Sequence, residues 1–174
     1  MSRPFFPATD YSGMNTSRYD DDQLLICDID GVILDPSGRE HLAPPAELMH
    51  QNENWMLHQH AINEAPDPIL DMNTRIVHCV ASFGKLVFLT SRLEIARDGT
   101  MRDLTAAGFL YPDVIMRKMD DHRPPSVLKA ERIAAIIDVR KPTRVFFIDD
   151  DPRVIEAVRA CRYPVTVHCM RLHK

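Results

Sequence analysis

Residues 23–31 read QLLICDIDG, an apolar run that ends in two aspartates and a glycine. Four further apolar runs of similar length lie at residues 85–89, 113–116, 144–148 and 164–168. Near-continuous runs of this length are typical of strands buried on both faces of a parallel sheet. The sequence therefore predicts five strands, the first of which leads directly into Asp28-Ile29-Asp30-Gly31.

Helical patterns separate these runs, at residues 68–83, 98–107, 126–139 and 152–161. The first places Ile69, Leu70, Ile76, Val77 and Val80 at roughly helical intervals, and the third carries Val127, Leu128, Ile133, Ile136 and Ile137 on one side. Gly84 and Gly108 follow two of the patterns as plausible C-terminal stops. Strands that alternate with helices indicate βαβ crossovers, so we expect an α/β fold with a doubly wound, Rossmann-like parallel sheet.

Two segments depart from this alternation. Residues 1–22 are polar and end in three aspartates, which favours a loosely ordered arm ahead of a domain at residues 23–174. Residues 39–67 contain three prolines and Trp55, with room for one or two helices over residues 45–61. This second segment is the only space for a small insertion between the first strand and the first long helix.

Composition narrows the class of protein. The 174 residues carry a formal net charge of -4, which gives no overall attraction to nucleic acid or anionic membranes. No apolar run approaches the ~20 residues of a membrane helix, and the first residues lack the features of an export signal. The cysteines Cys27, Cys79, Cys161 and Cys169 show no CxxC spacing and indicate reduced, buried thiols. We therefore expect a cytoplasmic, single-domain protein (host cytoplasm, if phage-encoded).

Polar groups suited to phosphate follow the predicted strands. They are Asp28 and Asp30 after the first, Thr90, Ser91 and Arg92 after the second, and Asp149, Asp150 and Asp151 after the fourth. Ligands bind open α/β sheets at the carboxyl ends of strands, and clustered acids there favour a Mg²⁺ ion. Lys129, early in a helix, can supply a positive charge to a phosphate. Each feature alone also fits an acidic turn, a helix cap or a solvated loop, but their shared position and order favour one site.

This order of motifs resembles the haloacid dehalogenase superfamily of phosphohydrolases, over about residues 23–169. Response-regulator receiver domains use similar groups, but in them the lysine comes last, whereas Lys129 precedes the acidic pair. The resemblance implies that Asp28 attacks phosphorus and that Asp30 acts as general acid and base. It implies Mg²⁺ held by Asp28, the Asp30 backbone carbonyl and Asp149 or Asp150. Phosphate oxygens would contact Thr90 or the Ser91 amide, together with Lys129.

A finer resemblance is to the phosphatase half of bacteriophage polynucleotide kinase/phosphatases, which remove 3'-phosphates from nucleic acid ends and nucleotides. It adds Arg39, Arg92, Arg117 and Arg123 as substrate-binding residues and a small cap at residues 39–67. No phosphate-binding loop of the kinase type occurs, so a kinase or ligase would be a separate partner. One position departs from the family pattern, because Pro125 stands where an aspartate is usual.

Several readings remain open at this stage. The alternatives to end repair are a phosphatase for mononucleotides or sugar phosphates and a non-catalytic phosphate-binding module. Residues 117–144 hold eight bases against four acids, which fits a substrate surface or solvated helix faces equally well. For Trp55, packing within the protein is favoured over stacking on a nucleic acid base. The spacing of His50, His58 and His60 matches no usual zinc pattern. Oligomeric state and preference for DNA or RNA are left undetermined.

Overall fold

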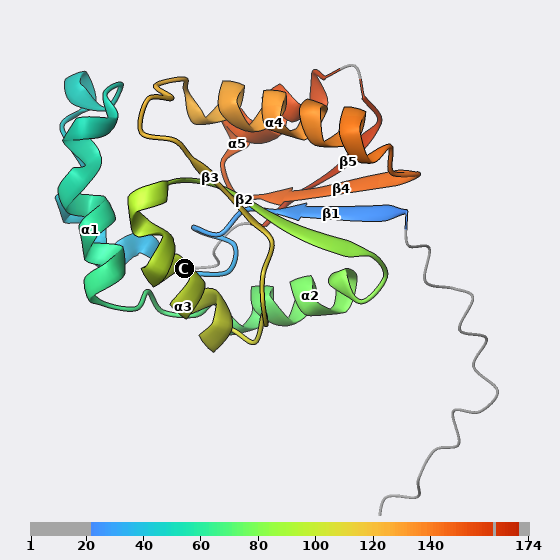
Figure 1. The fold of residues 1–174 in the computed structure, drawn as a ribbon, viewed down its shortest axis with the longest axis horizontal. Coiled ribbons are helices and arrows are strands. Elements are labelled where there is room, and N and C mark those ends of the chain that lie inside the picture. Colours follow the sequence, from blue (N-terminus) through green and yellow to red (C-terminus); the bar gives the residue numbers. More distant parts are fainter. Residues whose placement is uncertain (1–21, 162, 171–174) are drawn as a thin grey trace, which may run out of the picture.

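The computed structural model describes residues 22–161 and 163–170. Its centre is a sheet of five strands: β1 (Gln23–Cys27), β2 (Lys85–Leu93), β3 (Val114–Arg117), β4 (Arg144–Asp149) and β5 (Val165–Cys169). All pairings are parallel, in the order β3-β2-β1-β4-β5 (Figure 1). The predicted doubly wound α/β fold is thereby confirmed.

The register of the sheet brings the site residues together. Cys27 at the end of β1 lies level with Phe88 of β2 on one side and Ile148 of β4 on the other. Asp28 and Asp149, each one residue further along, therefore emerge side by side from the two central strands. This proximity follows from parallel pairing alone.

Helices cover both faces of the sheet (Figure 1). The helices α2 (Asp71–Ala81) and α3 (Arg97–Ala106) lie on one face, and α4 (Pro125–Arg140) and α5 (Pro152–Arg159) lie on the other. Successive β1 side chains alternate between the two cores: Leu25 and Cys27 join the first, Leu24 and Ile26 the second. Burial on both faces explains why β1 is apolar from Leu24 to Cys27.

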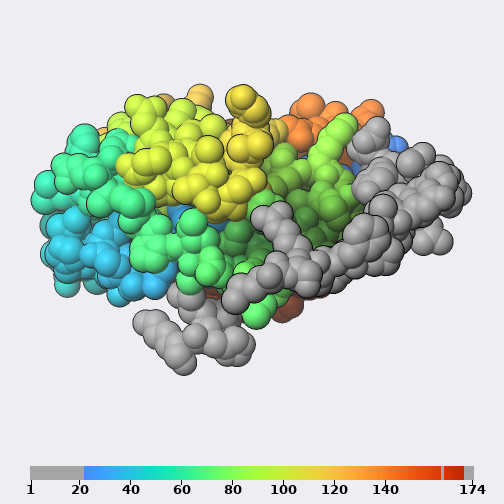
Figure 2. Space-filling view, turned by 90° about the horizontal axis from the view of Figure 1, so that it is seen from below, coloured from blue at the N-terminus to red at the C-terminus, as the bar shows by residue number. Residues whose placement is uncertain are grey.

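Residues 36–65, which we call the cap, form three short 3-10 helices followed by α1 (Met56–Glu64). The short helices are η2 (Pro36–Leu42), η3 (Ala46–Leu48) and η4 (Asn52–Trp55). Figure 1 shows α1 beyond the carboxyl ends of the central strands, and Figure 2 shows the cap and α3 as neighbouring parts of one surface. At Gly99 of α3 an added Cβ would lie 2.1 Å from the Ile62 carbonyl oxygen of α1, so the two helices approach too closely for a side chain there.

Several details differ from the sequence predictions. β5 is a largely exposed edge strand, because among residues 22–161 and 163–170 no further strand pairs with its outer side. Ile76 and Val127 are 44% and 40% exposed, so they lie outside the apolar faces assigned to their helices. Cys27 is buried as expected, but Cys79 and Cys169 are exposed.

Strand β2 is longer than predicted and includes Thr90, Ser91 and Arg92, which the sequence placed after its end. The predicted arm at residues 1–22 falls almost entirely outside the described part of the chain. Within residues 22–161 and 163–170, no helix is long and apolar enough to cross a membrane.

Candidate active site

Lys129 joins the acids at the ends of the two central strands. Its Nζ atom lies 2.7 Å from Oδ2 of Asp28 and 2.8 Å from Oδ2 of Asp149. All three residues are buried, with at most 6% of any of them exposed. The other Asp149 oxygen accepts the backbone N–H of Asp151 at 2.9 Å. Lys129 thus offsets part of the negative charge that parallel strand pairing concentrates here.

The residues present fit a divalent cation. Asp28, Asp149 and Asp150 each offer a carboxylate oxygen, and these oxygens lie within 4.8 Å of one another. Burial raises the pKa of Asp28 to about 8, with Lys129 opposing and the charge of Asp149 adding to the rise. Burial and the charge of Asp149 raise the pKa of Asp150 to about 6. Lys129 therefore leaves the acids only partly compensated, and hard oxygen donors in this state suit Mg²⁺.

The turn after β1 fixes where these acids point. Gly31 has a φ of +75°, a conformation that glycine adopts without strain. A Cβ at Gly31 would lie 2.1 Å from Oδ2 of Asp150, so the turn packs directly against that carboxylate. The carbonyl of Ile29 accepts three backbone N–H groups of residues 32–34, which closes the turn.

Asp30 points away from the other acids and toward two buried arginines. Nε and Nη2 of Arg92 donate to its two oxygens at 3.0 and 2.7 Å, and Nη2 of Arg39 also binds Oδ1. Burial opposes the ionisation of Asp30, but Arg92 and Arg39 outweigh it and hold the pKa of Asp30 well below its usual range. Any contact of Asp30 with a metal would therefore fall to its backbone carbonyl, which stays a prediction.

The arginines meet a fourth charged residue, Asp67, that the sequence did not reveal. Its carboxylate accepts Nε of Arg39 at 3.1 Å and Nη2 of Arg92 at 2.6 Å. Asp67 lies in the connection between α1 and α2, a stretch with no strand or motif to mark it. In the sequence, Asp67 stands out only in that Pro66 and Pro68 flank it and restrict its backbone.

The hydroxyl groups predicted to bind phosphate lie on β2. Oγ1 of Thr90 accepts the backbone N–H of Arg92 at 3.1 Å, which leaves the hydroxyl proton of Thr90 available to donate. Oγ of Ser91 is buried and has no hydrogen-bond partner among the described residues. Both have hydrogen-bonding capacity to spare, and their contact with phosphate remains a prediction.

Arg117 and Arg123, also predicted to bind substrate, stabilise the loop between β3 and α4. Nη1 of Arg117 donates to the carbonyls of Asp121 and Arg123 at 2.8 and 2.6 Å. Nε of Arg123 donates to Asp121 at 2.8 Å, and Nη1 of Arg123 binds Glu131. Asp121 thus supplies Arg123 with a carboxylate, while Pro125, a departure from the expected sequence pattern, begins α4.

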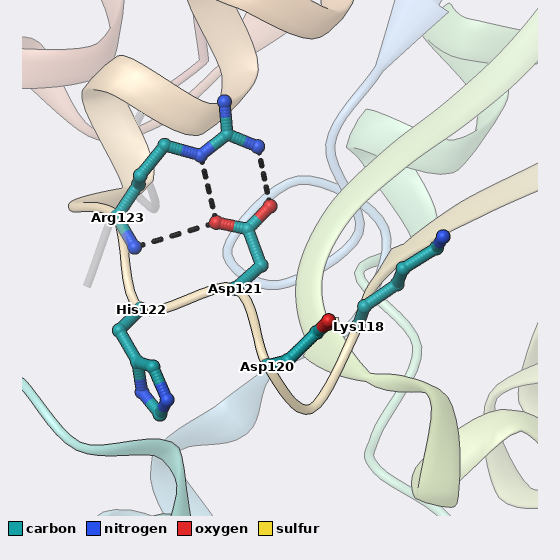
Figure 3. A pocket seen from close by; sticks show the side chains of 5 residues that line it. All are labelled: Lys118, Asp120, Asp121, His122 and Arg123. Carbon is teal, nitrogen blue, oxygen red and sulfur yellow. Dashed lines mark hydrogen bonds and ion pairs between the residues drawn. The ribbon is translucent and has the colours of Figure 1, made fainter.

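This loop surrounds an open pocket of about 550 Å³. Figure 3 shows its lining residues: Lys118, Asp120, Asp121, His122 and Arg123. The cap is fastened to the loop by buried Asn52, whose Nδ2 donates to the carbonyls of Met119 and Asp121 at 2.8 and 3.0 Å. The residues that line the pocket thus all belong to the loop to which the cap is fastened.

The aromatic residues of the cap pack within it. Nε1 of Trp55 donates to the carbonyl of Met49 at 3.0 Å, and its ring meets His58 edge to face at 5.1 Å. Burial and the nearby charge of Arg39 lower the pKa of His58 to about 4, so the neutral ring accepts Nη1 of Arg39. Among the described residues, no histidine belongs to the group of side chains that could hold a metal ion.

Known structures share this fold. One is a structure of a Pnkp1/Rnl/Hen1 complex, with a TM-score of 0.60 and 19% identity over 94% of this chain. A second, of the Pnkp1/Rnl/Hen1 RNA repair complex, gives 0.59 and 19% over 95%. The chain spans only 50% and 46% of those two chains. A haloacid dehalogenase-like hydrolase from Burkholderia xenovorans LB400 gives 0.59 and 12%, over 84% of this chain and 80% of that one.

The expected resemblance to haloacid dehalogenase-like hydrolases is thus confirmed, and the chain has their fold. No protein-family model matches the sequence. No curated protein matches it either.

Proposed function

We propose that this protein is a Mg²⁺-dependent phosphomonoesterase that acts through an aspartyl-phosphate and removes 3'-phosphates from nucleic acid ends or nucleotides. The observation that carries the proposal is the position of Asp28. It follows the central strand, contacts Lys129 at 2.7 Å and lies beside Asp149 and Asp150. A carboxylate with these neighbours would be a nucleophile whose repulsion from the negatively charged phosphate is offset by Lys129 together with a bound divalent cation.

In the first step, an oxygen of Asp28 forms a bond to phosphorus while the bond from phosphorus to the ester oxygen breaks. Lys129 already contacts Oδ2, so Oδ1 of Asp28 is the oxygen that attacks. The leaving oxygen receives a proton from Asp30. Because the arginines keep Asp30 ionised in the free protein, Asp30 takes that proton up from a substrate bound as the monoanion.

In the second step, Asp30 accepts a proton from water while the water oxygen attacks the aspartyl-phosphate. The bond between phosphorus and Asp28 breaks, which releases phosphate and restores the carboxylate. Thr90, Ser91 and Lys129 would hold the phosphoryl oxygens through both steps. A bound Mg²⁺, held by Asp28, the Asp30 carbonyl and Asp149 or Asp150, supplies positive charge to the transferring phosphoryl group.

The choice of a nucleic acid end as substrate is supported by three features. The cap is small, the pocket in the loop that it contacts carries Lys118, His122 and Arg123 together with Asp120 and Asp121, and two similar structures are of complexes that contain Pnkp1, one of them an RNA repair complex. Arg117 and Arg123 would act on the substrate through the loop that they hold. Arg39 and Arg92 would act on it through their contacts with Asp30. A separate ligase or kinase would then act on the repaired end.

The test compares an oligonucleotide carrying a 3'-phosphate with the same oligonucleotide carrying a 5'-phosphate, each with Mg²⁺ and with EDTA. We expect Mg²⁺-dependent release of phosphate from the 3' end at a rate well above that from the 5' end. Asp28→Asn is expected to abolish release, and the exposed Asp98→Asn serves as the matched control. Equal release from both ends would point to a small-molecule phosphatase, and no release from any phosphomonoester would point to a binding module.

A further inference from the structure

We propose that Asp67 is a positioning residue for Asp30, and that it acts by fixing the two arginines that hold the Asp30 carboxylate. The inference deepens the proposed function and rests on it. No sequence motif marks Asp67, and the steps described above do not use it.

The contacts of Arg39 show how Asp67 aims this side chain. Asp67 accepts Nε of Arg39 at 3.1 Å, His58 accepts Nη1 at 2.8 Å, and Nη2 is left to bind Asp30. Each nitrogen of the guanidinium thus has its own partner. Because a guanidinium is planar and rigid, fixing Nε and Nη1 determines where Nη2 points.

Arg92 is held in the same manner from a different element. Nη1 donates to Oγ1 of Thr100 at 3.1 Å, and Nη2 donates to Asp67 at 2.6 Å and to Asp30 at 2.7 Å. Asp67 therefore contacts both of the arginines that bind Asp30, and it shares Nη2 of Arg92 with Asp30. It joins the cap, which carries Arg39, to β2, which carries Arg92.

The charges of the network balance. Two guanidinium groups, 5% and 1% exposed as residues, face two carboxylates. Loss of the charge on Asp67 would leave a buried positive charge in excess, and the arginines would move or take water as a partner. Asp30 would then lose the orientation that proton transfer to the leaving oxygen requires.

The experiment measures kcat/KM for Asp67→Asn with two substrates, each in the presence of Mg²⁺. β-Glycerophosphate has an alkoxide leaving group that needs a proton, whereas p-nitrophenyl phosphate has a stable leaving group that does not. We expect kcat/KM to fall about 10- to 100-fold for β-glycerophosphate and only about threefold for p-nitrophenyl phosphate, by analogy with other supporting residues and general acids. A reduced folded fraction lowers both values equally, so the ratio reports positioning alone.

Asp103→Asn is the matched control. Asp103 is also buried and accepts the backbone N–H of Asp67 at 3.3 Å, but it makes no hydrogen bond to either arginine of the network. We expect this variant to affect both substrates to the same extent. Asp67→Glu, which keeps the charge but displaces it by one methylene, serves as a second variant if Asp67→Asn fails to fold, and we expect a smaller loss of the same selectivity.

An equal fall for both substrates in the Asp67 variants, or no fall, would overturn the positioning role while leaving the phosphatase intact. A wild-type protein that releases phosphate with Mg²⁺ from neither of these compounds nor from a 3'-phosphorylated oligonucleotide would instead overturn the proposed function, and the role of Asp67 with it.

Discussion

Nζ of Lys129 lies 2.7 Å from Oδ2 of Asp28, although 100 residues separate them in the chain. The contact links the first turns of α4 to the residue that directly follows β1 in the central sheet. It places a buried cation on the nucleophile of the proposed reaction. Several expectations depend on this contact and on its surroundings.

Replacing Lys129 by methionine should separate metal binding from turnover. The variant leaves Asp28 and Asp149 without their shared cation, so we expect Mg²⁺ to bind more tightly because the acids attract it without competition. Turnover should fall on the order of 10²–10³, the usual cost of removing a positioned charge. Calorimetry with Mg²⁺ and steady-state kinetics measure the two effects. Weaker Mg²⁺ binding together with normal turnover would contradict the proposed role.

Removal of the metal should make stability depend on pH in a defined direction. The pKa values of Asp28 and Asp150 are raised to about 8 and about 6 in the folded protein. Between the unfolded value near 4 and these values, the folded state binds more protons, so its free energy of unfolding falls as pH rises. In EDTA, the contribution of Asp28 and Asp150 should therefore make the protein less stable at about pH 8.5 than at about pH 5.5.

Added Mg²⁺ should reverse this trend, since the ion replaces the protons. The increase in Tm caused by Mg²⁺ should be larger at the higher pH, because protons no longer compete for the carboxylates. Thermal unfolding at the two pH values, with and without Mg²⁺, measures both effects. Asp28→Asn removes one of the titrating groups and should flatten the pH dependence in EDTA. An equal Tm increase at both pH values would contradict the metal site.

Gly31→Ala should damage the site through one methyl group. The φ of +75° disfavours alanine, and its Cβ would lie 2.1 Å from Oδ2 of Asp150. We expect a loss of about 1–3 kcal/mol of stability from the backbone alone and a large loss of Mg²⁺-dependent activity. Gly38→Ala is the matched control, because an added Cβ there meets nothing within 4 Å. Equal activity and an equal free energy of unfolding in Gly31→Ala and Gly38→Ala would contradict this prediction.

Asn52→Ala should loosen the cap from the loop at residues 118–123. The side-chain amide of Asn52 satisfies the carbonyls of Met119 and Asp121, which would lose their buried donor. We expect a loss of about 1–3 kcal/mol and faster hydrogen exchange in the loop, followed by a higher KM for an oligonucleotide. Asn54→Ala, whose amide bonds only within the cap, should change neither exchange in the loop nor KM. Unchanged exchange in Asn52→Ala would refute the connection.

The sequence alone determined the sheet and the acids at its carboxyl edge. Apolar runs such as residues 23–27 and 144–148 mark buried parallel strands because both faces must be covered, and the residues that follow them meet at one edge. The proximity of Asp28, Asp149 and Asp150 follows from that reasoning, whereas Lys129 was placed in the site by the resemblance to haloacid dehalogenase-like hydrolases. Each apolar run is a local pattern, so the strands are visible in the sequence even though their pairing joins distant segments.

Only the tertiary structure decided the arrangement around Asp30. The contacts of Asp67 with Arg39 and Arg92 join the cap, the connection to α2 and β2, and no periodic pattern links these segments. The same reason explains Asn52, which reaches the loop after β3 from 66 or more residues away. Buried polar groups choose partners by geometry once the chain has folded, because each must satisfy its hydrogen bonds with whatever lies near it. Sequence spacing therefore revealed the acids that follow the strands, and the folded chain determined which groups hold them.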